Sequence, residues 1–386
     1  MERVFVVGAG MTTFGPQPDL EVHEMARRAV WAAIKSSGID PAAFKRQPTA
    51  AFAGHAYQGP CFAQKTMMKI GLQGMSMINV ENACASGSTA IIGAATSIKS
   101  GDVELAIAFG GEKLTRPGGG FLPVVADDLE SAMGRVMPAA FAMQAQLHMN
   151  KYGTTREQMA MVAVKSRRNG ALNPYCHFKE QVTIEQVLSA PSIADPLTRL
   201  SCCPVSDGAA AVVLASESAF RKMGLNGVEL AGYALVSGER TPFGIVDYKS
   251  EMSMRAAKLA YERAGLGPED VDLCEMHDPF TIAEIIHYED LGFCRPGEGG
   301  AYVERGLSAI GGGGVAVSPS GGLMSKGHPL GATGVAQVAE MFWQLRDEAG
   351  GRQVPGARIG LTHTVGGGVT KLEAGASTVM LFKRLG

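Results

Sequence analysis

The stretch NVENACASGSTAIIGAATSIKSG, residues 79–101, contains the feature that decides the fold, a cysteine between a strand and a helix. The segment SMINV, residues 76–80, predicts a buried strand, and the small and apolar residues from Ser86 onward follow helical spacing. Cys84 therefore lies at a predicted helix N-terminus, where free backbone N–H groups and the helix dipole favour the thiolate. The alternative is a small buried cysteine that only packs, and position alone does not distinguish the two.

The composition is that of an ordinary globular protein, with 386 residues, 46% hydrophobic and 19% charged. A formal net charge of −2 gives no electrostatic reason to expect nucleic acid or an anionic membrane as a partner. The N-terminus lacks the features of a signal peptide, and no apolar run approaches the roughly 20 residues of a membrane span. The 7 cysteines show no metal-ligand spacing. We therefore expect a cytoplasmic protein with free thiols and no metal.

The chain contains an internal repeat. Residues 25–44, MARRAVWAAIKSSGIDPAAF, resemble residues 254–273, MRAAKLAYERAGLGPEDVDL, in helical spacing and in a turn that contains proline. Each copy precedes a short strand that ends near a histidine, His55 in the first half and His277 in the second. The repeat therefore predicts two halves with the same order of elements.

The repeat continues beyond these histidines. A turn of small residues leads into a helix at Cys84 in the first half and at His328 in the second. An apolar strand that runs into glycines follows in each half, at residues 103–112 and 357–368. Two halves rich in βαβ units predict an α/β protein with parallel or mixed sheets and helices on the sheet faces.

The segment between the two halves differs in composition, being richer in methionine, proline and loop signals. It predicts an insertion in the first half. We expect the N-terminal half to comprise residues 1–112 and 206–222, the insertion residues 113–205, and the C-terminal half residues 223–386.

Active sites in such sheets lie at the carboxyl ends of the strands. The predicted strand ends before His55, Cys84, His277 and His363 should therefore converge, and His328 should join them at the start of a helix. This grouping of a cysteine with histidines favours a reactive Cys84 over one that only packs.

The sequence argues against a dinucleotide-binding motif. The segment GAGMTTFG, residues 8–15, follows a strand, but Thr13 stands where the third glycine of the motif is required. No acidic residue lies at the expected later strand end, so NAD is not an expected cofactor.

Four motifs together resemble the thiolase superfamily: NACASGS, SPSGGLMSKGHPLGATG, HDPFTIAEIIHYEDLGFC and VSDGAAAVVLAS. The likeness is greatest to the sterol carrier protein x type of thiolase and its bacterial and archaeal acetyl-CoA acetyltransferase-like relatives. It covers essentially the whole chain. The resemblance implies two duplicated α/β halves in a five-layered αβαβα arrangement, with a loop domain inserted in the first half.

The resemblance also implies roles for the residues that match the family motifs. Cys84 matches the nucleophile that takes up the acyl group as a thioester. His328 of GHP matches the histidine that activates this cysteine, and His277 of HDPF matches the residue that completes an oxyanion site for the thioester oxygen.

A second oxyanion hole is implied by the backbone N–H groups of Cys84 and Gly366, and such donors are commonly worth about 3 kcal/mol each. Ser320 and Gly321 are the positions at which we expect contacts with coenzyme A. No covalently bound cofactor is expected, and CoA is a substrate.

The chain departs from the family at the second catalytic cysteine, which protonates the enolate carbon. Thr364 occupies its place in the C-x-G motif, and Pro279 replaces the cysteine that sterol carrier protein type relatives supply in HDCF. An acid is still required at that carbon, so we expect His363 or His55 to replace the missing cysteine. Cys294 is expected to belong to the core.

Three functions remain open at this point. The first is a thiolase that cleaves a 3-oxoacyl-CoA, with a branched or aromatic acyl group favoured, or runs the condensation in reverse. The second is other carbon–carbon bond chemistry, such as C-acyl transfer or retro-aldol cleavage, although a retro-aldolase would not need Cys84. The third is a non-catalytic subunit that binds acyl-CoA.

The resemblance also implies partners. We expect a homodimer, and a separately encoded zinc-ribbon/OB-fold protein is a further partner that such relatives often have.

Overall fold

The computed structural model describes residues 2–115, 129–240, 250–368 and 374–386. Within these ranges no helix combines the length and apolar character that crossing a bilayer requires.

The strands are β1 (Val4–Met11), β2 (Thr49–Gly54), β3 (Ser76–Val80), β4 (Leu105–Glu112), β5 (Ser192–Ala194), β6 (Leu197–Thr198), β7 (Gly208–Ser216), β8 (Val228–Val236), β9 (Leu273–Glu275), β10 (Ala316–Val317), β11 (Ile359–Gly366) and β12 (Ala376–Arg384). The helices are α1 (Val22–Ser37), α2 (Ala43–Arg46), α3 (Phe62–Ile70), α4 (Ser86–Lys99), α5 (Leu129–Ala132), α6 (Met137–Tyr152), α7 (Arg156–Ala171), α8 (Ile184–Ser189), α9 (Glu217–Lys222), α10 (Glu251–Ala264), α11 (Thr281–Asp290), α12 (Gly299–Glu304), α13 (Gly322–Ser325) and α14 (Leu330–Gln344). A short 3₁₀ turn, η1 (Ala83–Ala85), precedes α4.

The main sheet is mixed, and the described residues form 10 strands of it in the order β10-β9-β11-β12-β8-β1-β7-β4-β2-β3. Its two halves are equivalent: β1-β7-β4-β2-β3 and β8-β12-β11-β9-β10 each begin with two antiparallel pairings and end with two parallel ones. The halves meet where β1 and β8 pair antiparallel. The duplication predicted from the sequence is confirmed.

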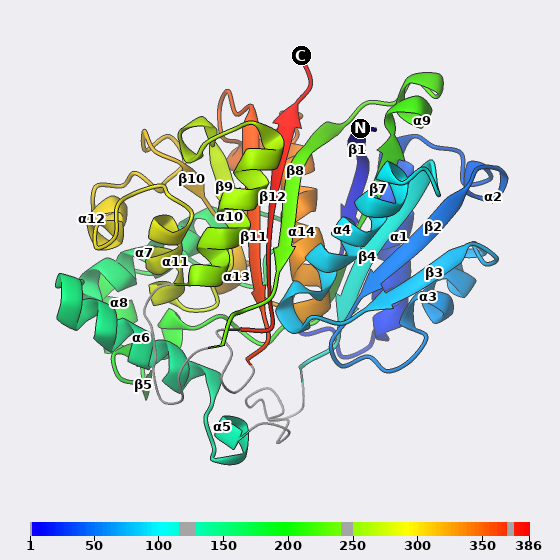
Figure 1. Cartoon of the computed structure of the whole chain (residues 1–386). Coiled ribbons are helices and arrows are strands. Elements are labelled where there is room, and N and C mark those ends of the chain that lie inside the picture. Colours follow the sequence, from blue (N-terminus) through cyan, green and yellow to red (C-terminus); the bar gives the residue numbers. More distant parts are fainter. Residues whose placement is uncertain (1, 116–128, 241–249, 369–373) are drawn as a thin grey trace.

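The helices form three layers around the two half-sheets, as Figure 1 shows. Helices α4 and α14 lie between the halves, and Ile91 of α4 and Val335 of α14 share a core with inward-facing residues of both half-sheets. Helices α1 and α3 cover the outer face of the first half, and α10 and α11 cover that of the second. The predicted five-layered αβαβα arrangement is confirmed.

Small residues let the two central helices meet. A Cβ on Gly87 of α4 would lie 2.4 Å from the carbonyl oxygen of Gly331 in α14. A Cβ on Gly334 would lie 2.5 Å from a backbone nitrogen of α4. Glycine is therefore required on both sides of this crossing, which brings together the start of α4, next to Cys84, and the start of α14, next to His328.

One predicted feature is wrong at the edge of the sheet. The segment SMINV forms β3 as predicted, but β3 is an edge strand whose only partner in the described part of the chain is β2, and Ile78 is 47% exposed. Alternating apolar residues indicate that one face of a strand is buried. They do not reveal whether the same chain or another chain buries it.

The segment between β4 and β7 contains α5 to α8 and the small hairpin of β5 and β6. In it, α7 packs against α11, α12 and α13, so the segment joins the second half through side-chain packing although it interrupts the first half in sequence. The exact domain boundaries stay a prediction.

Candidate active site

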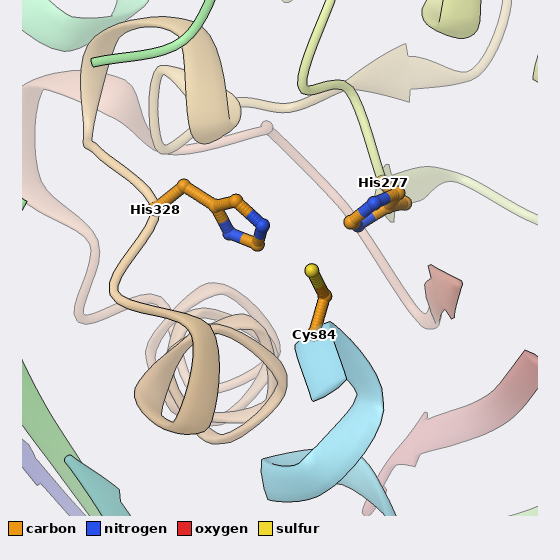
Figure 2. Close-up of side chains that lie close together, drawn as sticks. All are labelled: Cys84, His277 and His328. Carbon is orange, nitrogen blue, oxygen red and sulfur yellow. The ribbon is translucent and has the colours of Figure 1, made fainter. Parts of the chain in front are cut away.

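Three side chains that the sequence analysis singled out meet in the structure. The sulfur of Cys84 and a ring nitrogen of each of His277 and His328 all lie within 4.8 Å of one another. Figure 2 shows the three side chains pointing toward one another from separate segments. The imidazole centroids are 5.3 Å apart, with the ring planes at 72°.

Hydrogen bonds hold the turn that carries Cys84. Ala83 has a φ of 46°, a left-handed conformation that costs free energy in a residue with a Cβ. The N–H of Asn82 donates to Oγ of Ser86 (2.9 Å), that hydroxyl donates to the carbonyl of Ala83 (2.6 Å), and the N–H of Ala83 donates to Glu81 (2.7 Å). The turn is therefore fixed before any substrate arrives.

The end of β11 lies directly against this turn. A Cβ on Gly366 would lie 2.0 Å from the carbonyl oxygen of Asn82 and 2.7 Å from the nitrogen of Ala85, so only glycine fits. The backbone N–H groups of Cys84 and Gly367 act on the sulfur and favour its negative charge. The second donor at the sulfur is thus Gly367, one residue beyond Gly366, and an oxyanion role for Gly366 stays a prediction.

The acidity of Cys84 differs from the sequence-based expectation. Burial, and then the negative charge of Glu112, raise the pKa of the Cys84 thiol to about 12, although two backbone N–H groups oppose the shift. The expectation that the helix N-terminus favours a thiolate is wrong here because desolvation outweighs it. Cys84 is a neutral thiol at neutral pH and needs a base to become a nucleophile.

His328 is oriented to be that base. Its Nδ1 lies 2.8 Å from Oγ1 of Thr333, and this hydroxyl donates to the carbonyl of Pro329 (3.0 Å). The hydroxyl has one proton, so it must accept from Nδ1–H, which leaves the lone pair on Nε2. Burial, and then the charge of Lys326, lower the pKa of His328 to about 3, so the ring is neutral.

His277 offers an unused hydrogen-bonding group to a ligand. The residue is 5% exposed, and its Nδ1 is buried with no hydrogen-bond partner among the described residues. Burial, and then the charge of His328, lower the pKa of His277 well below its usual value. An unpaired nitrogen on a buried neutral imidazole is rare in folded proteins and indicates a group that a ligand completes.

Glu112, which the sequence analysis missed, organises this site. Its buried carboxylate accepts hydrogen bonds from the N–H groups of Ala56 (3.0 Å), Tyr57 (2.9 Å) and Gly331 (2.9 Å) and from the side-chain amide of Gln58 (2.6 Å). It therefore joins the loop after β2 to the first turn of α14. The sequence feature that could have identified Glu112 is that it is a single carboxylate at the end of the apolar strand β4.

His363 is not brought to Cys84. It lies within β11 rather than after its end, its Nε2 is 2.9 Å from Oγ of Ser253, and its ring contacts His287 at 4.5 Å between centroids. Thr364 points the other way, toward α14, where its hydroxyl donates to Gln337 (2.7 Å). The prediction that a strand ends before His363 is wrong, and the alternation of side chains along β11 turns its ring toward α10 and α11.

His55 follows β2 as predicted and lies beside the site, outside the group of three. Its ring packs against Phe62, 5.2 Å between centroids, and its Nδ1 is buried without a partner among the described residues. Burial lowers the pKa of His55, while Glu112 and Glu81 oppose this shift. Both carboxylates also act on Cys84. A catalytic role for His55 stays a prediction.

Ser320 and Gly321 have structural contacts. The hydroxyl of Ser320 is fully buried and donates to Glu275 (2.6 Å), which also pairs with Lys326 (3.1 Å). A Cβ on Gly321 would lie 2.8 Å from the Cα of Gly170. This network supports the loop before His328, and it gives no support to the predicted contact of these residues with CoA.

The cysteines have the expected state. All 7 are free, and Cys294 is partly buried against the core of the second half, as predicted. A thiol and two imidazoles are also the donors that zinc binds, so the predicted absence of a metal stays a prediction.

The arrangement can perform acyl transfer. It combines a thiol, a neutral imidazole with a free lone pair, backbone donors beside the sulfur and a buried imidazole without a partner. These are the parts that nucleophilic catalysis at a carbonyl carbon requires.

Sequence families match both halves of the chain. Residues 4–218 match the family described as "Thiolase, N-terminal domain", and residues 245–380 match "Thiolase C-terminal domain-like".

Curated relatives match over nearly the full chain. An acetyl-CoA acetyltransferase of Methanothermobacter thermautotrophicus is 39% identical, with 100% of both chains covered. Sterol carrier protein 2 of Oryctolagus cuniculus is 39% identical over 99% of this chain and 72% of that protein. The benzoylsuccinyl-CoA thiolase subunit BbsB of Thauera aromatica is 38% identical over 95% of each chain.

Solved structures share the fold. A structure titled "Ltp2-ChsH2(DUF35) aldolase" aligns with a TM-score of 0.83 at 22% identity, over 99% of this chain and 98% of that one. Human mitochondrial 3-ketoacyl-CoA thiolase in complex with CoA aligns with a TM-score of 0.74 at 19% identity, over 100% and 98% of the chains.

Proposed function

We propose, from the premise that this chain belongs to the thiolase family, that this acyltransferase cleaves a 3-oxoacyl-CoA with CoA, or forms one in reverse, through an acyl group on Cys84. The resemblance stated from the sequence motifs is confirmed by the two family matches. The observation that carries the mechanism is the meeting of the Cys84 thiol with His328 and His277 within 4.8 Å.

Acylation begins when Nε2 of His328 takes the proton of Cys84 and the sulfur attacks the C3 carbonyl carbon. The resulting oxyanion faces the backbone N–H groups beside the sulfur. Each such donor typically contributes about 3 kcal/mol to the stabilisation of the transition state. The bond between C2 and C3 breaks, its electron pair goes to C2 as a thioester enolate, and the acyl group remains on Cys84. The ring nitrogen of His277 that lies within 4.8 Å of the sulfur of Cys84 binds the enolate oxygen.

Deacylation uses the same groups. The thiol of CoA loses its proton and attacks the acyl carbon, which balances the proton that C2 of the enolate takes up, while the sulfur of Cys84 leaves and regains its own proton from His328. The solved human thiolase that aligns with this chain is a complex with CoA, which supports CoA as the acceptor here.

The relatives support a CoA thioester substrate without fixing its acyl group. One is named for acetyl-CoA and another for benzoylsuccinyl-CoA, and the two are almost equally similar to this chain, at 39% and 38% identity. We keep the prediction of a branched or aromatic 3-oxoacyl group, because the second name supports an aromatic one.

The exposed edge of β3 supports a homodimer. Ile78 on β3 is 47% exposed, and Met68 on the adjacent α3 is 66% exposed. An apolar edge strand with unpaired backbone groups is a template for a strand of a second copy. The strand leads directly into the turn that carries Cys84, so this interface would support the nucleophile.

A second protein is a further proposed partner. The fold is shared with a structure whose title names a DUF35 component, and one relative is named as a subunit. These names support the predicted zinc-ribbon/OB-fold partner. A cytoplasmic location also stays a prediction.

Product analysis tests this function. The purified protein is incubated with acetoacetyl-CoA, a branched 3-oxoacyl-CoA and benzoylacetyl-CoA, each with and without CoA, and the products are identified by mass spectrometry. We expect acetyl-CoA and the shortened acyl-CoA only when CoA is present, and no products from Cys84→Ala. Cleavage that needs neither CoA nor Cys84 would contradict the proposal and favour retro-aldol chemistry.

A further inference from the structure

A segment with two adjacent cysteines lies against the residues that follow His277. The backbone N–H of Cys203 donates to the carbonyl of Pro279 (2.8 Å), and Cys202 forms an antiparallel bridge with Phe280. Cys203 therefore lies opposite Pro279, which is two residues from a member of the catalytic group. The loop insertion thus brings Cys203 to the border of the active site.

The two thiols have different surroundings. The thiol of Cys202 donates to the carbonyl of Thr198 (3.3 Å), and its side chain packs against the core of the second half. The backbone at Cys202 is extended, so the next side chain points to the opposite side. Cys203 is partly exposed.

Cys203 holds its proton and shares an electrostatic environment with the nucleophile. Burial raises the pKa of the Cys203 thiol well above its usual value, and ionisation of Cys202, Cys84 or Asp278 would raise it further. The protonation states of Cys203 and Cys84 are therefore linked electrostatically.

The reaction needs an acid that the group of three does not supply. Cleavage leaves an electron pair on C2, while His328 already holds the proton of Cys84 and neutral His277 is needed at the enolate oxygen. The hydroxyl of Thr364 donates its hydrogen bond to Gln337, so it is not available as the acid. The ring of His363 lies on the other face of β11.

We propose that Cys203 is a further catalytic residue, the acid–base group that protonates C2 of the leaving enolate. This inference rests on the proposed function. The S–H bond of Cys203 breaks as the C2–H bond forms, which releases the shortened acyl-CoA and leaves a thiolate on Cys203. The incoming CoA thiol then gives its proton to this thiolate as its sulfur attacks the acyl group on Cys84, so that both cysteines are restored.

The position of His277 supports this placement independently. A ring nitrogen of His277 lies within 4.8 Å of the sulfur of Cys84, and Nδ1 of the same ring lacks a hydrogen-bond partner among the described residues, so the ring can bind a ligand oxygen there. With the enolate oxygen bound to His277, C2 is one carbon away from that anchored group. Pro279 and the facing Cys203 border the same end of the site.

The test separates acyl transfer from proton transfer at carbon. Cys203→Ala, Cys203→Ser and the matched control Cys202→Ala are compared with the parent protein in two assays. The first follows acylation of Cys84 by acetyl-CoA with peptide mass spectrometry, and the second follows exchange of the acetyl protons with solvent deuterium. We expect both Cys203 variants to accept the acetyl group at nearly the parental rate and to lose exchange by about a hundredfold or more. Cys202→Ala should match the parent in both assays.

Every other pattern contradicts the inference. Exchange at the parental rate in Cys203→Ala would show that another group is the acid. Loss of both reactions in the two Cys203 variants, with parental circular dichroism spectra, would show that Cys203 binds substrate or supports the site. If the parent protein neither acylates Cys84 nor exchanges protons, the proposed function itself fails, and this result is distinct from failure of Cys203 alone.

Discussion

The reactivity of Cys84 depends on the base beside it, because burial has removed the acidity that a helix N-terminus supplies. With a thiol pKa of about 12 and an imidazole pKa of about 3, the neutral pair of Cys84 and His328 dominates throughout the physiological range. The thiolate is therefore formed in the reaction and is not stored before it.

This account predicts how alkylation of Cys84 depends on pH. A raised thiol pKa means that the thiolate fraction grows as pH rises, by about tenfold per pH unit until the pKa is reached. The rate of iodoacetamide modification of the Cys84 peptide should therefore climb from pH 6 to pH 10 without levelling off. A plateau already reached at pH 7 would reveal a stored thiolate–imidazolium pair and contradict the account.

Thr333 is the residue that sets the hydrogen-bonding state of His328. Thr333→Val removes the acceptor for Nδ1–H and leaves a buried donor unpaired, which costs about 1–3 kcal/mol. We expect acylation of Cys84 by acetyl-CoA to slow by at least about tenfold, since the ring then loses its orientation as a general base. Thr333→Ser keeps the hydroxyl and should restore most of the rate, and an unimpaired Thr333→Val would refute this role.

The sequence was informative about residues that lie at strand ends. Cys84, His277 and His328 were predicted to converge because the duplication fixes which strand ends share an edge of the sheet. Glu112 and Cys203 could not be predicted, because their roles arise from contacts between segments that are distant in the chain. The histidine in β11 was misplaced because a shift of one residue changes the face of a strand.

At the scale of elements, the crossing of α4 and α14 positions both the nucleophile and its base. Gly87→Ala tests this crossing. In an exposed helix this change usually stabilises by about 0.5–1 kcal/mol. Here the new methyl group would meet a carbonyl oxygen of α14 at 2.4 Å, so we expect a loss of about 1–3 kcal/mol and a drop in activity.

Urea unfolding and the rate of thiolysis measure the two effects of Gly87→Ala. Gly351→Ala is the matched control, because a Cβ there would meet only one atom, of Leu172, at 3.8 Å. Unchanged or increased stability of Gly87→Ala would show that the helices can separate without consequence.

At the scale of the whole molecule, the repeated strand order explains why the site lies between the halves. Each half brings one helix start to the centre, α4 with Cys84 and α14 with His328, so neither half is complete alone (Figure 1). The repeat was visible in the sequence because helix spacing and turn residues recur. The exposure of β3 was not visible in the sequence. An edge strand that a second copy covers has the same pattern of apolar residues as a strand in the core of one chain.

The exposed edge of β3 predicts a dimer that Ile78 helps to hold. Light scattering of the parent protein at micromolar concentration should give twice the chain mass. Ile78→Asp should give a monomer with reduced thiolase activity, because a charge on this edge opposes strand pairing. Met254→Asp, at an exposed apolar position on α10, is the control and should remain dimeric. A fully active monomeric parent protein would overturn this assembly.

The most direct test of the central claim is to find the acyl group. The protein is mixed briefly with a 3-oxoacyl-CoA in the absence of CoA, quenched in acid and digested, and the peptides are mapped by mass spectrometry. The account predicts an acyl adduct on the peptide that contains Cys84, which subsequent addition of CoA removes, and no adduct in a folded Cys84→Ala variant. An adduct on Cys61 or Cys294 instead, or turnover that persists in Cys84→Ala, would contradict it.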